Sequence, residues 1–285
     1  MISETGHVTS NTAQVTMKIF LEKVDQILSK RQKIILTSVI VTIGFILITQ
    51  PVNILFKRYY LVGILALVTY FSMLFSLWKG MTRSKAILLF ILPVLYVCAF
   101  LGFYFLFKYV RWLTRLPAAI FFAISLYWLI LSQNILNVAS DRAIPLYRAA
   151  STANFVYTIF TFILLVGIIF SLSLPFYWNG VLVAIVSFPL SLQSLWSIKM
   201  EKLNSQIVVY SVVLSLILGE SAVALSFWPQ APLVNALYVN SINYIFLGIL
   251  SEYLRDKLKK RVILEYSQIG GGLMLIIFLI TSFFS

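Results

Sequence analysis

The sequence predicts an all-α fold, a polytopic bundle of about nine transmembrane helices whose N-terminus lies in the cytoplasm. Hydrophobic residues make up 61% of the 285-residue chain and charged residues only 11%, too few charges to cover the surface of a soluble domain. Apolar runs of about 20 residues recur along the whole chain, which is the length that a helix needs to cross a bilayer. The runs are continuously apolar rather than alternating, so the pattern of transmembrane β-strands is missing.

The first 33 residues are predicted to lie outside the membrane. Residues 1–16 are polar and form a cytoplasmic tail without the apolar core of a signal peptide. In residues 17–33, Phe20, Val24 and Ile27 share one helical face while most of the basic residues lie elsewhere. This pattern is typical of a basic amphipathic helix on an anionic membrane surface. A plain extension of the first span fits it as well, and both interpretations remain open.

A single transmembrane domain is predicted over residues 34–285, with a basic cytoplasmic segment at 252–268. Nine spans can be placed in it, at residues 34–49, 59–78, 86–107, 117–138, 154–172, 176–196, 207–228, 233–251 and 269–284. The ninth is short and has three consecutive glycines near its start. The basic segment before it fits either a helix on the cytoplasmic leaflet or an ordinary basic loop.

The distribution of basic residues predicts the orientation. Lys and Arg on the side of the N-terminus outnumber those on the other side by 17 to 5 when the spans are counted off in order. Because basic loops stay in the cytoplasm, the N-terminus is expected inside and, with nine spans, the C-terminus outside. The same bias accounts for the net charge of +13. We therefore expect the bilayer and anionic lipids at its cytoplasmic face as partners, and no nucleic acid.

Glu220 is the one acidic residue inside an apolar run. A carboxylate in hydrocarbon is expensive, so Glu220 is expected to face the protein interior and to find a polar partner there. Small residues form a narrow stripe on another side of the same span, which predicts close packing against a neighbouring helix. These residues are Ser211, Ser215, Gly219, Ala222 and Ser226. Covered on two sides, this span is expected to be a central helix of the bundle.

Asn240 and Asn243 are the expected partners of Glu220. The short turn at 229–232 places Glu220 level with Asn240 in an antiparallel hairpin, and Asn243 shares a helical face with Asn240. An amide can hydrogen-bond a carboxyl group whether or not the carboxyl carries a proton. The three residues therefore predict either a proton- or cation-linked site or a hydrogen bond that only fixes helix packing.

A second polar constellation lies at the end of the fourth span. Asn134, Asn137 and Asp141 fall on one helical face, and Arg142 and Arg148 follow them. Together they predict a cytoplasmic vestibule or a site for an anionic head group, with the two arginines as anion partners. The alternative is capping at the interface, in which Asp141 holds a helix end and pairs with an arginine.

The stretch from Ile135 to Ser151 reads ILNVASDRAIPLYRAAS. It resembles a segment of an uncharacterised family of multi-pass bacterial membrane proteins, and the resemblance covers spans four to six. The resemblance implies a protein of the inner (cytoplasmic) membrane. It implies no activity that could be carried over to particular residues.

Several catalytic classes lack their motifs here. The single histidine, His7, lies in the tail and the single cysteine, Cys98, in an apolar run, so neither a zinc site nor a Ser/His protease is expected. No catalytic residue, cofactor or metal is assigned. The leading interpretation is a carrier or permease-like protein for a small solute or ion. The alternatives are a non-catalytic partner in membrane assembly or envelope biogenesis and, with less support, an enzyme that modifies lipid head groups.

Overall fold

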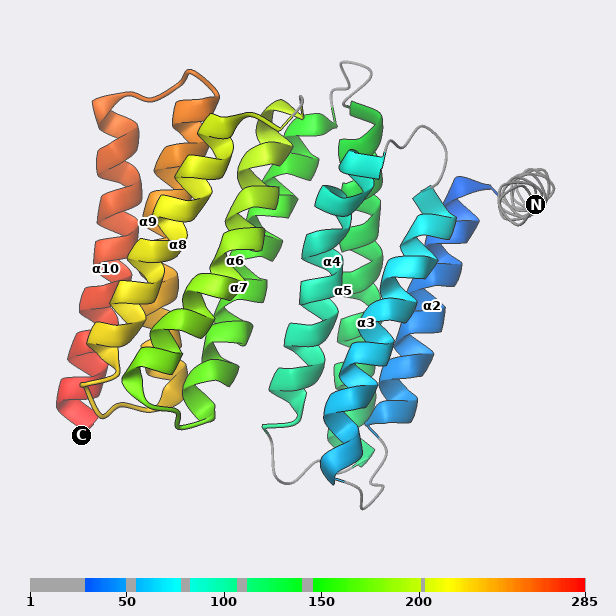
Figure 1. The fold of residues 1–285 in the computed structure, drawn as a ribbon, viewed down its shortest axis with the longest axis horizontal. Helices are drawn as coiled ribbons and strands as arrows, with labels where there is room; N and C mark the ends of the chain where they lie inside the picture. Colours follow the sequence, from blue (N-terminus) through cyan, green and yellow to red (C-terminus); the bar gives the residue numbers. More distant parts are fainter. Residues whose placement is uncertain are drawn as a thin grey trace, which may run out of the picture.

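A computed structural model of the chain describes residues 29–49, 55–77, 83–106, 112–139, 146–200 and 203–284. Within these ranges every regular element is an α-helix, and there are nine of them (Figure 1). They are α2 (Lys30–Ile48), α3 (Leu55–Leu77), α4 (Arg83–Tyr104), α5 (Trp112–Ala139), α6 (Tyr147–Ser171), α7 (Phe176–Lys199), α8 (Ser205–Leu225), α9 (Pro232–Leu254) and α10 (Lys260–Phe284). All nine are long and apolar enough to cross a membrane.

The predicted all-α polytopic bundle is therefore confirmed for the described residues. The tail and most of the amphipathic segment before residue 29 lie outside them, and the cytoplasmic placement of the N-terminus stays a prediction. Seven of the nine described helices are longer than the predicted spans, because hydropathy marks only the part that lies in hydrocarbon. Thus α6 begins at Tyr147 rather than at residue 154, and α10 at Lys260 rather than at residue 269. Residues 252–268 are divided between α9, a turn and α10, and do not form a helix of their own.

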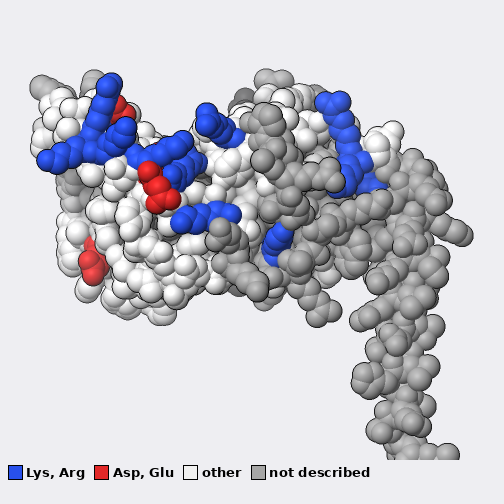
Figure 2. All heavy atoms as spheres, turned by 90° about the horizontal axis from the view of Figure 1, so that it is seen from above, with Lys and Arg blue, Asp and Glu red and all other residues white. Residues whose placement is uncertain are grey.

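Helices that follow one another along the chain run in opposite directions (Figure 1). One end of the bundle holds nearly all the described Lys and Arg side chains, and we call it the basic end. These residues are Lys30, Arg31, Lys33, Lys85, Arg148, Lys199, Arg255, Lys257, Lys259, Lys260 and Arg261. Figure 2 looks onto this end and shows the basic side chains spread across it, with few acidic ones between them. At the opposite end, the one basic side chain that the structure describes is Arg115.

Four of the described helices, α4, α6, α7 and α9, each pack against four others, and the partners of α6 are α4, α5, α7 and α9. The expectation that the seventh span would be central is wrong. That span is α8, which packs against α7 and α9 and leaves its remaining side exposed. The last helix, α10, packs chiefly against α9, and most of its described side chains are exposed.

An aromatic cluster ties the first helices together. Phe45 of α2 stacks on Phe122 of α5 with ring centroids 4.8 Å apart, and Tyr104 of α4 meets Phe45 edge-on at 5.3 Å. Tyr96 of α4 extends the cluster to α6, where its ring centroid lies 5.8 Å from that of Tyr157. Edge-on and offset pairs of this kind add stability beyond the burial of their area.

The stripe of small residues on α8 packs against α7, which confirms the predicted close packing against a neighbouring helix. Ser211 and Ala222 in this stripe are fully buried, and Gly219 lies against the backbone of Gly180 on α7. Close backbone approach of this kind is what small residues provide in membranes, where lipid gives no hydrophobic drive between helices. Because consecutive helical residues are rotated by about 100°, turning Gly219 toward α7 turns Glu220 to the exposed side of α8.

Candidate functional site

Three amide side chains meet inside the bundle at the contact of α5, α6 and α7. Gln133, Asn154 and Gln193 are each at most 1% exposed. Asn154 Oδ1 accepts hydrogen bonds from Gln133 Nε2 at 2.8 Å and from Gln193 Nε2 at 2.9 Å. Asn154 Nδ2 in turn donates to Gln193 Oε1 at 3.5 Å and to Ser197 Oγ at 3.2 Å. We call these four residues the amide network.

The amide network lies at one depth. Gln133 and Gln193 are both six residues before the ends of α5 and α7, and Asn154 is seven residues after the start of α6. At 1.5 Å per residue this places all three about 10 Å below the basic end. Buried amides are favourable only when their donors and acceptors are paired. The network therefore fixes how α5, α6 and α7 are rotated against one another.

A hollow opens at the basic end between α6, α7 and α9. Its outer part has a volume of about 410 Å³ and its inner part about 90 Å³. The two parts share Ser151, Thr152, Ile198 and Arg255, and we call them together the basic recess. The other polar residues that line it are Tyr147, Arg148, Lys199 and Lys257 in the outer part and Ser194, Ser197, Ser251, Glu252 and Tyr266 in the inner part. Ser197 belongs to both the recess and the amide network.

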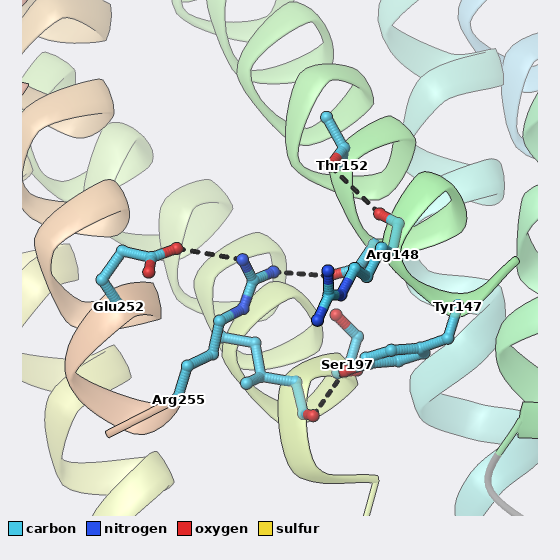
Figure 3. Close-up of polar contacts among 8 residues, drawn as sticks. Tyr147, Arg148, Thr152, Ser197, Glu252 and Arg255 are labelled. Atoms are coloured by element: carbon cyan, nitrogen blue, oxygen red, sulfur yellow. Dashed lines mark hydrogen bonds and ion pairs between the residues drawn. The ribbon is translucent and has the colours of Figure 1, made fainter. Parts of the chain in front are cut away.

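Arg255 crosses the basic recess from the end of α9. Its Nη1 donates to Glu252 Oε1 at 2.9 Å, and its Nη2 donates to Ser151 Oγ of α6 at 2.7 Å. Figure 3 shows the guanidinium group between Glu252 and α6. Its side chain is 32% exposed and that of Glu252 18%. A guanidinium group has five N–H donors, so three of them remain without a partner among the described residues.

Tyr147 fixes the wall of the recess where α6 begins and α7 ends. Its hydroxyl donates to the backbone oxygen of Ser197 at 3.2 Å and also to that of Ile198. The last carbonyls of a helix have no partner within the helix, so these bonds satisfy the end of α7. The chain then leaves α7 through Met200, whose φ of 51° is left-handed.

The charges of the recess favour an anion. Among the described residues, four cations line it, Arg148, Lys199, Arg255 and Lys257, against the single carboxylate of Glu252. Arginine binds phosphate and carboxylate groups through two parallel hydrogen bonds, and serine hydroxyls can add further donors. The recess thus has the groups that hold a small phosphorylated or carboxylated molecule, or an anionic lipid head group.

Glu220 is not part of this site. Its side chain lies on the exposed side of α8, which corrects the expectation that it faces the interior. Glu220 has no hydrogen-bond partner among the described residues. Asn243, by contrast, is buried on α9, with 2% of its surface exposed. Asn240 is half-buried, and its Oδ1 has no partner in the described part of the chain. The depth of the three residues was predicted from the turn, but depth does not determine how each helix is rotated.

Of the second predicted set, Arg148 lines the basic recess. Asn137 is buried at 3% exposure and Asn134 is half-buried, both in the last turns of α5 and outside the recess. Asp141 and Arg142 lie outside the described residues. A vestibule or head-group role for the whole set stays a prediction.

Sequence reasoning missed Asn154, Gln193 and Arg255. A usable signal existed for the first two, because they lie equally far from the turn at Ser173 and Leu174 that joins their spans. Two amides at the same depth in a hairpin are candidates for a hydrogen bond across it. Arg255 carried no such signal, because it is one of five basic residues in a short segment and only the fold turns it toward α6.

A family described as "Protein of unknown function (DUF5656)" matches residues 38–280 of this chain. The chain belongs to this family. The match runs from within α2 to near the end of α10, so both the amide network and the basic recess lie in the region that defines the DUF5656 family. No curated protein matches the chain. No solved structure matches it either.

The DUF5656 family has no known function, which is consistent with the resemblance of the sequence to an uncharacterised family. The family description names no activity, so the function has to be argued from the geometry of this chain. The nine apolar helices in the described residues fit an integral, multi-pass membrane protein, and membership of a family of unknown function is compatible with this.

Proposed function

We propose that this membrane protein is a carrier or permease-like protein that takes up a small anionic solute at the basic recess. The observation that carries the proposal is the position of Arg255, whose guanidinium spans the recess and leaves three donors without a partner among the described residues. Glu252 and Ser151 already hold the Arg255 side chain in place. Binding of an anion therefore costs little further conformational entropy of this side chain.

The position of the amide network next to the recess supports a carrier. Ser197 joins the recess to the amide network, which consists of uncharged donors and acceptors inside the bundle. Neutral polar groups bind an anion weakly enough to release it, and conduction or transport needs such weak, successive sites. Ligand sites in helix bundles are built in the same way, from side chains on facing helices.

The expected setting follows from the charges. Basic loops remain in the cytoplasm, so the basic end and its recess are proposed to face the cytoplasm of a bacterial cell, with the protein in the inner membrane. The positive recess would then draw anions from the cytoplasm or from the anionic lipid of that leaflet.

Binding of inorganic phosphate, sulfate and small carboxylates to the purified protein tests the site. In nanodiscs of neutral lipid, Arg255→Gln should weaken binding of the best anion at least about tenfold, because hydrogen bonds to a charged group are among the strong ones. Arg261→Gln is the matched control. It removes the same charge at the same end, but Arg261 pairs with Glu265 on exposed α10 and lies outside the recess.

Two further measurements separate the sources of the anion. If anionic lipid added to the nanodiscs displaces the bound solute, a lipid head group is the ligand. If it does not, uptake of the labelled anion into proteoliposomes should follow its binding and should be lost in Arg255→Gln. Equal binding by both arginine variants, or binding without any uptake, would contradict the carrier proposal.

A further inference from the structure

The exposed side of α8 carries a carboxylate in an otherwise apolar surface. Glu220 lies there among large exposed side chains, with Val213 at 49% and Leu216 at 55% exposure. The helix is long and apolar enough to cross a membrane. We propose that this side of α8 is a docking surface for one transmembrane helix of another protein, and that this helix bears a basic residue that pairs with Glu220.

The depth of Glu220 is the first support. It lies five residues before the end of α8 at Leu225, or about 7.5 Å along the helix axis. The side chains of a helix lean toward its N-terminus, and the N-terminus of α8 is at the basic end. The carboxylate therefore points toward the middle of the membrane and away from the nearer interface. Acidic groups at such depth face protein or pair with another charge.

The spacing of the exposed residues is the second support. Val209, Val213, Leu216, Glu220 and Ala224 of α8 follow one another at intervals of four, three, four and four residues, and all are exposed. Apolar residues at alternating intervals of three and four form the seam along which two helices pack at a small angle. Transmembrane helices commonly pack at this angle. One polar residue within such a seam fixes the register and the choice of partner.

Charge decides between the candidate occupants. A second copy that used the same seam in parallel would bring two Glu220 carboxylates together, and like charges at close range repel. A purely apolar helix would leave the carboxylate without a partner. A helix with Lys or Arg at the matching depth removes both difficulties, so the surface fits a basic partner helix best. The basic recess is lined from α6, α7, α9 and α10, so this inference does not depend on the proposed carrier function.

The test uses the full-length protein in liposomes of neutral lipid. A fluorescent donor is attached at Phe227→Cys in a Cys98→Ser background, and the acceptor is placed on a leucine-rich transmembrane peptide with one Lys a quarter of the way along. The peptide with Lys should associate about three- to thirtyfold more tightly than the same peptide with Leu, the range found for polar contacts between membrane helices. Glu220→Leu should abolish the difference.

A second pair of variants tests the seam itself. Val213→Trp should weaken association of the Lys peptide by crowding the seam, while Ile185→Trp, which is 61% exposed on α7, should not. Thermal unfolding of each variant checks that it is folded. Equal association of the Lys and Leu peptides, or equal effects of the two tryptophans, would overturn the proposal. So would Glu220-dependent energy transfer between two labelled copies of the protein, because the occupant would then be a second copy.

Discussion

Gly180 on α7 and Gly219 on α8 bring the two helices into backbone contact. A Cβ atom added to Gly219 would lie 2.9 Å from the carbonyl oxygen of Gly180 and 3.0 Å from Cβ of Ala184. A Cβ atom on Gly180 would lie 3.1 Å from the carbonyl oxygen of Gly219. Since backbone atoms cannot move aside as a flexible side chain can, the rotation of α8 is fixed by this pair.

Gly219→Ala is expected to destabilise the protein by about 1–3 kcal/mol, the usual cost of overpacking a close contact. The control is Gly271→Ala on α10, where an added Cβ meets nothing within 4 Å. Because alanine is the better helix former by up to about 1 kcal/mol, the control should be neutral or stabilising. Thermal unfolding in detergent measures both, and a shift of the same sign in the two variants would contradict the close packing.

Asn154→Leu should cost about 1–3 kcal/mol, because it leaves the amides of Gln133 and Gln193 buried without their main partner. Thr158→Val is the matched control one turn away. Among the described residues, the Thr158 hydroxyl is bonded only to the backbone oxygen of Asn154 on its own helix, at 2.8 Å, so little stability should be lost. If the two variants unfold at the same temperature, the amide network is not what holds α5, α6 and α7 in register.

Glu252→Gln is expected to strengthen anion binding at the recess. The substitution removes the one carboxylate that lines the recess in the described part of the chain, while the glutamine amide oxygen can still accept the hydrogen bond that holds Arg255 in place. Ion pairs of this exposure contribute little, so the gain should be roughly twofold to fivefold in affinity. Glu265→Gln removes the same charge from a pair on α10 that lies outside the recess and should leave binding unchanged. A loss of affinity in Glu252→Gln would mean that Glu252 orients Arg255 more than it competes.

The proposed orientation can be tested with single cysteines in a Cys98→Ser background. Ser173 lies in the turn between α6 and α7, at the end opposite Lys257, and both side chains are exposed. An impermeant maleimide added to intact cells should label Ser173→Cys, and should label Lys257→Cys only after the membrane is opened. The reverse result would place the basic end outside and remove the proposed cytoplasmic access to the recess.

The sequence located the turns between spans, but not which surroundings each face of a helix meets. The turn at 229–232 predicts one level for Glu220 and Asn240, yet the Glu220 side chain is exposed whereas Asn240 is half-buried. The same reasoning applied to the turn at Ser173 would have paired Asn154 with Gln193, which the structure joins by a hydrogen bond. The difference lies in the small-residue stripe, since the contact of Gly219 with α7 turned Glu220 outward.

The number of spans was predicted correctly for the described residues, while the ends of the helices were not. Hydropathy locates the part of a helix that lies in hydrocarbon, but it does not show how many polar helical turns extend beyond it. The basic recess is built almost wholly from such turns, with Tyr147, Ser151, Lys199 and Arg255 all outside or at the edge of the predicted spans. The candidate site was therefore the part of the molecule least visible in the sequence.

The contacts of α6 also imply an order of assembly during synthesis. Helices α2 to α5 pack against one another, and all four enter the membrane before α6 is made. Because α6 contacts α4 and α5 as well as α7 and α9, its insertion connects helices α2 to α5 with the helices that are synthesised later. Chains fold from the N-terminus as they leave the ribosome, so a chain that ends before α6 is expected to leave α2 to α5 as an intermediate whose α6-facing side has no partner.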